Sequence, residues 1–205
     1  MRKVLFTFIL AASALLATAQ DKNGYQLPPE AIVSLIDAPQ TPSVNISPDN
    51  TVMLLLYRPG LPTIADLSQP EYRLAGMRFA PSTNGPSRGQ SVNRITAMKI
   101  DGTLIGDLKG LPAEPRIGGV TWSHDSRRFA FTNTNDNTIE LWVADAATMT
   151  AGKIDEGLNG LFRGSMEWLP DGSLIYLRTL DGRPYRYCGC NRGLAPTAQG
   201  TEIYQ

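Results

Sequence analysis

Hydrophobic and polar positions recur in the same order at three places along this chain of 205 residues. Each copy has two apolar residues separated by one position, then a short polar turn with an aspartate, then a run of apolar, β-branched or aromatic residues. Alternation before a turn is typical of a strand with one buried face, so each copy predicts a β-hairpin. The three copies are Ser43–Tyr57, Gly119–Thr134 and Ser165–Thr179.

The turn of each hairpin is predicted at a Pro-Asp or His-Asp pair that contains Asp49, Asp125 or Asp171. Proline presets φ for a turn, and an aspartate side chain accepts a hydrogen bond from the backbone two residues further on. The three aspartates are therefore predicted to form turns rather than to act in catalysis. The same alternation places Trp122 and Trp168 on a buried face.

Two short helices are predicted outside the hairpins. The first follows Pro28-Pro29 and ends before Pro39, and its apolar stripe is expected to cap the β body. The second is a single turn at Ile64–Leu67, inside a loop. Arg73–Ser91 then predicts a short strand followed by a turn-rich loop, because Asn84-Gly85-Pro86 forces the chain to turn.

Further strands are predicted between the copies and after them. Asp101-Gly102 is a strong hairpin signal between two apolar runs. After the second copy, alternation turns Trp142 and Ala144 to one face of a strand and Leu141 and Val143 to the other. The Gly189–Gln205 tail has little pattern. The segments predicted as strands are Ile95–Ile100, Thr103–Leu108, Thr138–Asp145, Thr148–Ile154 and Arg183–Cys188.

The strands arrive in runs of about four, and each run opens with one of the hairpins. Asp125 and Asp171 are 46 residues apart, whereas Asp49 and Asp125 are 76 apart because Arg58–Ser91 is inserted. A four-stranded unit of this length is the period of a β-propeller blade. We therefore expect an all-β fold: a partial β-propeller with about two antiparallel four-stranded blades, the start of a third, and a short N-terminal helix. A β-sandwich, the alternative, would not explain the repeat.

The N-terminus has the pattern of a secretory signal peptide. Arg2 and Lys3 precede the uncharged apolar run Val4–Leu16, and Ala17-Thr18-Ala19 has the form of a cleavage site. An uncleaved anchor is the alternative, but the run is short for a membrane span. The expected domains are a signal peptide at 1–19, an extension with the helix at 20–42 and an incomplete propeller at 43–205. The expected location is periplasmic or secreted, without membrane contact after cleavage.

The composition excludes several classes of function. Lys plus Arg and Asp plus Glu each number 19, and no basic cluster is interleaved with aromatic residues, so a nucleic-acid partner is not expected. Cys188 and Cys190 are too close for an unstrained bridge, which leaves free thiols, an intermolecular bond or no role. Their spacing and their distance from the single histidine, His124, do not favour zinc. No metal and no cofactor are expected.

Several longer motifs resemble a known family. They are NGYQLPPEAIVSLIDAPQTPSVNISPD, YRLAGMRFAPSTNGPSR, the W-S-x-D hairpin and LWVAD. From about Gly24 to its end, the chain resembles the N-terminal region of the glutamyl endopeptidase branch of the prolyl oligopeptidase family. The resemblance implies a bacterial periplasmic serine peptidase in which a propeller covers an α/β-hydrolase domain that carries Ser, Asp and His. It also implies cleavage after acidic residues, chiefly glutamate, in small or flexible peptides.

No catalytic, substrate-binding or metal residue of that family is assigned on this sequence. The only Gly-x-Ser-x-Gly spacing, at Gly85–Gly89, lies in the predicted turn-rich loop and not between a strand and a helix, so it does not predict a nucleophile elbow. His124 stands where the other copies have Pro48 and Pro170, which indicates a turn residue. An arginine fork suits an acidic ligand, so Arg78 and Arg88 could face a central pocket. The alternative for both arginines is surface charge or the pinning of a loop.

The expected function is that of an N-terminal propeller fragment that gates substrate access in an exported serine peptidase. Peptide substrates would reach a hydrolase domain that this chain lacks, so the chain alone is predicted to be inactive. The alternative is a standalone, non-catalytic periplasmic module that binds peptides or proteins. A third and weaker hypothesis is an inactive partner of other propeller chains. The sequence leaves the oligomeric state open.

Overall fold

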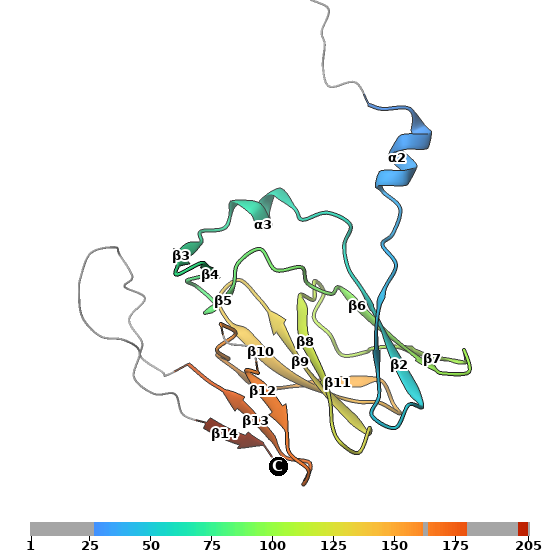
Figure 1. The fold of residues 1–205 in the computed structure, drawn as a ribbon, viewed down its shortest axis with the longest axis vertical. Helices are drawn as coiled ribbons and strands as arrows, with labels where there is room; N and C mark the ends of the chain where they lie inside the picture. Colours follow the sequence, from blue (N-terminus) through green and yellow to red (C-terminus); the bar gives the residue numbers. More distant parts are fainter. Residues whose placement is uncertain (1–26, 162–163, 180–200, 205) are drawn as a thin grey trace, which may run out of the picture. The chain divides into compact units, whose positions relative to one another are not determined.

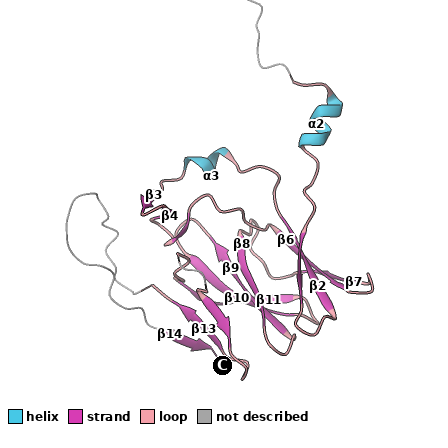
Figure 2. Cartoon of the chain, viewed as in Figure 1, coloured by secondary structure: helices cyan, strands magenta, loops and turns pink. Residues whose placement is uncertain are grey.

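The computed structural model describes residues 27–161, 164–179 and 201–204 (Figure 1). Within this part of the chain, almost all regular structure is β-strand, and there are two short helices. Figure 2 colours the helices cyan and the strands magenta. The strands form antiparallel sheets, two of them four-stranded. This arrangement confirms the predicted all-β, propeller-like fold with two four-stranded units and part of a third.

The first two sheets have the same construction, with strands that follow the order of the chain. The first has the order β1-β2-β6-β7 and the second the order β8-β9-β10-β11, all antiparallel. Their strands are β1 (Ser43–Ile46), β2 (Val52–Tyr57), β6 (Arg94–Lys99), β7 (Leu104–Asp107), β8 (Ile117–Trp122), β9 (Arg128–Thr134), β10 (Ile139–Asp145) and β11 (Thr150–Glu156).

The remaining strands form two smaller sheets. The third repeat is the sheet β12 (Met166–Trp168), β13 (Leu174–Leu177) and β14 (Thr201–Tyr204). The insertion between β2 and β6 forms the other, from β3 (Tyr72–Leu74), β4 (Met77–Ala80) and β5 (Gly85–Pro86). The predicted repeat, its three opening hairpins and the position of the insertion are confirmed, whereas β14 and most of the small inserted sheet were not predicted.

The hairpin turns have the predicted aspartate chemistry. Asp49 accepts a hydrogen bond from the backbone N–H of Thr51 at 3.2 Å, and Asp171 accepts one from Ser173 at 2.8 Å. The third residue of each turn has a positive φ, which only a few residue types adopt readily. These residues are Asn50 at 57°, Ser126 at 60° and Gly172 at 85°.

The apolar core lies between successive sheets, and strands β9, β10 and β11 of the second sheet contribute to both sides. Trp142 and Ala144 face the first sheet, while Leu141 and Val143 face the third, as the alternation predicted. The predicted burial of Trp122 and Trp168 is also confirmed. Fully buried side chains at the first interface are Leu54, Ile95, Ile117, Phe129 and Phe131, and those at the second are Leu141, Leu158 and Leu174.

The opening strands of neighbouring sheets contact each other. The Asn45 side chain of β1 donates to the carbonyl oxygen of Val120 in β8 at 3.2 Å, and the Trp168 indole of β12 donates to the carbonyl oxygen of Thr121 in β8 at the same distance. Strand β8 carries an irregular register between Gly118 and Thr121, where Gly119 has a φ of 55°. The three repeats are thus joined through β1, β8 and β12.

The N-terminal helix α2 (Glu30–Ile36) follows Pro28-Pro29 as predicted, and it does not belong to the unit of the strands, which begins at Pro39. None of the helix residues is buried, and Leu35 is 77% exposed. The expected packing of its apolar stripe on the β body stays a prediction. No helix in the described residues is long and apolar enough to cross a membrane.

Three further expectations fall on residues outside the described ranges. They are the signal peptide at 1–19, the strand expected at 183–188, and the state of Cys188 and Cys190. These stay predictions from the sequence.

Candidate functional site

The insertion between β2 and β6 is held against the second sheet. Its helix α3 (Ile64–Ser68) is capped by Thr63 and Asp66, which exchange side-chain and backbone hydrogen bonds. The backbone N–H of Gly160 donates to the carbonyl oxygen of Asn84 at 3.0 Å. Gly85 of the insertion packs so closely on Ile139 of β10 that an added Cβ would lie 2.6 Å from the Cδ1 atom of Ile139. The insertion is therefore a folded element with a fixed seat near the start of β10.

Three arginines of the insertion converge on one carboxylate, that of Glu71. One oxygen, Oε1, accepts from Arg73 at 3.0 Å and pairs with Arg78 at 3.4 Å. The other oxygen, Oε2, pairs with Arg88 at 3.2 Å and accepts from the Ser87 hydroxyl at 2.9 Å. Strands β3 and β4 and the loop after β5 supply these groups, so Glu71 holds three separate pieces of the insertion together.

The pKa of Glu71 lies below its ordinary value. The hydrogen bond from Ser87 is the main cause, and the hydrogen bond from Arg73 and the charges of Arg88 and Arg78 act in the same direction. Burial opposes these effects but does not overcome them. Glu71 is therefore a stable anion at neutral pH and a fixed anchor for the guanidinium groups.

The charges of this cluster do not balance. The Glu71 side chain is only 9% exposed, whereas those of Arg73, Arg78 and Arg88 are 65%, 48% and 42% exposed. Three cations thus share one nearly buried anion and present an outward-facing surplus of positive charge. Sequence analysis singled out Arg78 and Arg88, and the structure places both in contacts that pin the insertion, as the alternative for them predicted.

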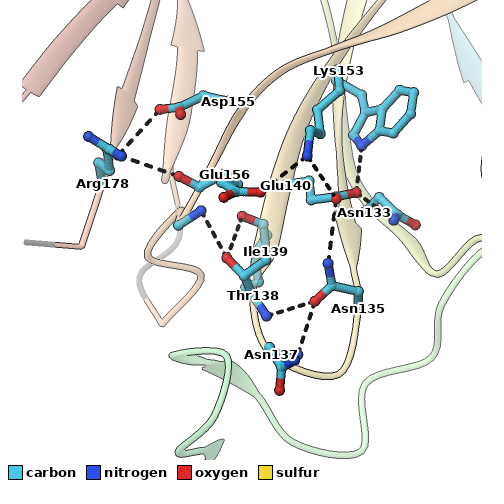
Figure 3. A network of polar contacts seen from close by, with 12 residues as sticks. Asn133, Asn135, Asn137, Thr138, Ile139, Glu140, Lys153, Asp155, Glu156 and Arg178 are labelled. Atoms are coloured by element: carbon cyan, nitrogen blue, oxygen red, sulfur yellow. Dashed lines mark hydrogen bonds and ion pairs between the residues drawn. The ribbon is translucent and has the colours of Figure 1, made fainter. Parts of the chain in front are cut away.

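A second polar network, shown in Figure 3, lies across β9, β10 and β11. Glu140 accepts hydrogen bonds from Asn133 and from the Trp142 indole, both at 2.9 Å, and pairs with Lys153 at 3.4 Å. Burial acts to raise the pKa of Glu140, but these hydrogen bonds and the charge of Lys153 outweigh it, so the pKa lies below its ordinary value. The network joins three neighbouring strands.

The same region connects the second sheet to the third. Asp155 on β11 accepts a hydrogen bond from the Tyr176 hydroxyl at 2.9 Å and pairs with Arg178 at 3.5 Å. Figure 3 shows Arg178 reaching Asp155 and the backbone of Glu156. Anions in this network meet cations or hydrogen-bond donors within the protein, and we assign it a structural role.

The described residues contain no group of three or more metal-binding side chains. His124 is exposed in the turn of the second hairpin, as predicted, and the neighbouring Ser123 hydroxyl donates to Asp125 at 2.6 Å. His124 is the single histidine of the sequence, and no hydrogen bond between it and a serine hydroxyl is found among the described residues. The arginine cluster on Glu71 is thus the strongest candidate for binding chemistry in the described part of the chain.

Comparison with known proteins supports the peptidase resemblance. No family model matches the chain. The chain is similar to proteins named probable glutamyl endopeptidase, chloroplastic. It is 36% identical to the Arabidopsis thaliana protein over 186 residues, which are 81% of this chain and 19% of that protein. It is also 36% identical to the Oryza sativa subsp. japonica protein over 166 residues, which are 74% of this chain and 18% of that protein. The chain therefore spans about a fifth of the length of these relatives.

Sequence reasoning missed half of the arginine cluster. Glu71 and Arg73 fell in segments predicted as a loop and as one short strand, so nothing connected them with Arg78 and Arg88. The available signal was local: Glu71, Arg73, Arg78 and Arg88 lie within 18 residues that carry no other charged side chain. A lone acid among three bases in a short segment indicates an anchored cationic cluster.

Proposed function

We propose that this chain is the N-terminal propeller region of an exported serine peptidase of the prolyl oligopeptidase family, in its glutamyl endopeptidase branch. The observation that carries the proposal is the 36% identity with the plant proteins over 81% of this chain, which corresponds to 19% of the Arabidopsis protein. The repeated four-stranded sheets support it, because they match the propeller that the sequence resemblance implies.

In the proposed enzyme, these sheets form part of a wall that limits which peptides reach the catalytic residues. The Ser, Asp and His groups belong to an α/β-hydrolase domain outside these 205 residues. The repeats supply stiffness, since each four-stranded unit buries an apolar face against the next. We assign no catalytic residue to this chain. Its proposed contribution is to control the access of peptides to the catalytic residues and to position those peptides.

The exposed apolar side chains on one face of the first sheet favour the hypothesis of a larger propeller over that of a standalone module. Ile46 lies opposite Met53 next to its turn, as Trp122 lies opposite Phe129 in the second sheet. Trp122 is 8% exposed, but Ile46 is 49% exposed. Val44 and Leu104 are also exposed, at 53% and 62%. Apolar positions that are covered in the next repeat are thus open in the first, and a further blade would cover them.

We further propose that the protein is exported to the periplasm or secreted. The support is the sequence of residues 1–19, with its basic start, apolar run and small-residue cleavage site. Cleavage after residue 19 would give a mature N-terminus near Gln20 or Asp21.

The experiment that tests the proposed function uses the native protein, captured from an envelope extract with an antibody to the inserted segment 64–86. The captured protein is treated with a fluorophosphonate probe and assayed on two peptides that differ only in Glu or Gln before the cleavable bond. We expect probe labelling and preferential cleavage after Glu. Captured protein that neither reacts with the probe nor cleaves either peptide would contradict the proposal and favour the non-catalytic module.

A further inference from the structure

We propose that Arg73, Arg78 and Arg88, held by Glu71, form a binding site for the acidic side chain of a peptide. This binding role is additional to the role of these residues in pinning the insertion. That the ligand is a peptide rests on the proposed function. The ligand's carboxylate would be the second anion of the cluster, beside that of Glu71.

The cluster carries a surplus of positive charge. Arg73, Arg78 and Arg88 all pair with Glu71, and no other acidic side chain of the described residues pairs with any of them. One anion among three cations leaves two positive charges to attract a ligand. A guanidinium group matches a carboxylate in shape, because two parallel N–H groups can meet its two oxygens.

The three guanidinium groups also have hydrogen-bond donors that their protein contacts do not use. Each guanidinium carries about five N–H donors. In the described part of the chain, Arg73 uses its Nε and Nη2 atoms on Glu71, Arg78 uses Nη1, and Arg88 uses Nε on Glu71 and Nη2 on the carbonyl oxygen of Leu67. The remaining donors sit on side chains that are 42% to 65% exposed.

The backbone of the insertion holds these like charges together. Arg73 and Arg78 are direct partners across the β3–β4 ladder, an arrangement that disfavours two cations. Arg88 has a φ of 56°, which is uncommon for a residue other than glycine and typical of backbone fixed by its surroundings. A single buried acid offsets these costs and orients all three side chains, so a ligand would meet an already ordered site.

The cluster also lies in a folded insertion that contacts the second sheet. It lies in the insertion between the second and third strands of a four-stranded unit, and the second sheet forms without any such insertion. The insertion is seated on the second sheet through Asn84 and Gly160, and Asp66 of α3 pairs with Arg116 of the segment before β8 at 3.6 Å. Folded loops on a rigid scaffold are common binding elements.

The test measures binding of two fluorescent peptides, identical except for one Glu or Gln, to the full-length native protein by anisotropy. The variants are Arg78→Gln and Arg88→Gln, and Arg58→Gln, which alters an exposed arginine outside the cluster, is the matched control. A lost charge-assisted hydrogen bond predicts about tenfold weaker binding of the Glu peptide in each cluster variant. The Gln peptide and the control variant should show no change.

Arg78→Lys separates binding from folding, because it keeps the charge that pairs with Glu71 but removes the planar fork. We expect it to retain the wild-type unfolding midpoint and to lose part of the preference for the Glu peptide. If the cluster variants bind both peptides as the wild type does, or weaken both equally, the proposed site is wrong.

The outcome is separable from that of the proposed function. Glu-specific cleavage that survives Arg78→Gln and Arg88→Gln unchanged would overturn the site and leave the peptidase proposal intact. Arginine-dependent binding of the Glu peptide by a protein without peptidase activity would support the site and contradict the proposed function.

Discussion

The indole N–H of Trp168 lies 3.2 Å from the carbonyl oxygen of Thr121 and joins the opening strand of the third sheet to that of the second. Trp122 holds the matching position in the second sheet, beside its own hairpin turn. Its indole N–H is buried and has no hydrogen-bond partner among the described residues. The two tryptophans hold equivalent positions in successive repeats, but only the indole N–H of Trp168 has a hydrogen-bond partner among the described residues.

This difference predicts unequal costs for replacing the two rings. Trp168→Phe removes a hydrogen bond and leaves the Thr121 carbonyl short of a donor, which should lower the free energy of unfolding by about 1 kcal/mol beyond the effect of lost ring area. Trp122→Phe removes an N–H that is already unsatisfied, so that extra cost should be absent. Urea denaturation of the two variants measures the difference. A Trp122→Phe variant that loses as much stability as Trp168→Phe would contradict this account.

Replacing His124 by proline tests its assignment as a turn residue. Pro48 and Pro170 stand at this position in the other hairpins, and no hydrogen bond from the backbone N–H of His124 is found in the described structure. His124→Pro should therefore raise the free energy of unfolding by about 0.4–1 kcal/mol, since it restricts the unfolded chain.

The matched control for that substitution is Ser126→Pro in the same turn. Ser126 has a φ of 60°, which a proline ring cannot adopt, so this variant should be clearly destabilised. The midpoints of thermal unfolding of both variants, compared with that of the wild type, measure these effects. Loss of stability in His124→Pro comparable with that in Ser126→Pro would show that His124 has a role other than the one assigned.

Gly110 tests the contact between the first and second sheets. The segment after β7 pairs with β11 through Lys109 and Thr150, and a Cβ on Gly110 would lie 2.5 Å from the carbonyl oxygen of Ala151. Gly110→Ala should therefore lower the free energy of unfolding through both a positive φ of 85° and a clash with backbone. The expected loss is about 2–4 kcal/mol.

Gly102→Ala is the control, because Gly102 has a similar φ of 90° but nothing within 4 Å of an added Cβ. It should cost only the conformational penalty, about 1–2 kcal/mol. The comparison, made by urea denaturation, isolates the packing contribution. Equal losses in the two variants would mean that the segment after β7 does not pack against β11 as described.

The Glu140 network predicts a loss of stability in acid. Because the folded-state pKa of Glu140 lies below its ordinary value of 4.5, its ionised form stabilises the fold at neutral pH. This contribution is present above pH 4.5 and should disappear as the pH falls through the lower folded-state pKa. Urea midpoints measured between pH 7 and pH 3 should therefore fall less steeply in Glu140→Gln than in the wild type.

The control for this prediction is Glu156→Gln, which removes a 60% exposed partner of the same Lys153. The urea midpoint of this variant should fall with pH almost as steeply as that of the wild type, because an exposed ion pair contributes little to stability. If the urea midpoint of Glu140→Gln falls with pH as steeply as that of the wild type, the loss of stability in acid does not come from Glu140.

The sequence predicted the repeats well because their signals are local. The hairpin turns depend on aspartates that bond two residues on, and the β6–β7 turn follows from Asp101-Gly102. The two faces of β10 follow from alternation, since Leu141 and Trp142 enter different cores. Each of these features is decided within a few residues of the chain.

The inserted sheet and the site could not be predicted in the same way. Strand β5 has two residues, Gly85 and Pro86, and neither favours a strand by itself. Its place depends on Ile139 and Gly160, which lie far along the chain. Glu71 meets Ser87 across 16 residues, so that contact exists only once β3, β4 and β5 have paired. Strand β14 likewise depends on pairing with β13.

The size of the native protein shows whether these repeats belong to a longer peptidase. An immunoblot of an envelope extract with an antibody to residues 24–37 compares the mature protein with the 22.3 kDa of this chain. The account predicts a band several times heavier, because the chain corresponds to 19% of the Arabidopsis relative. A single band at or just below 22.3 kDa would contradict it, because the chain would then act without a hydrolase domain.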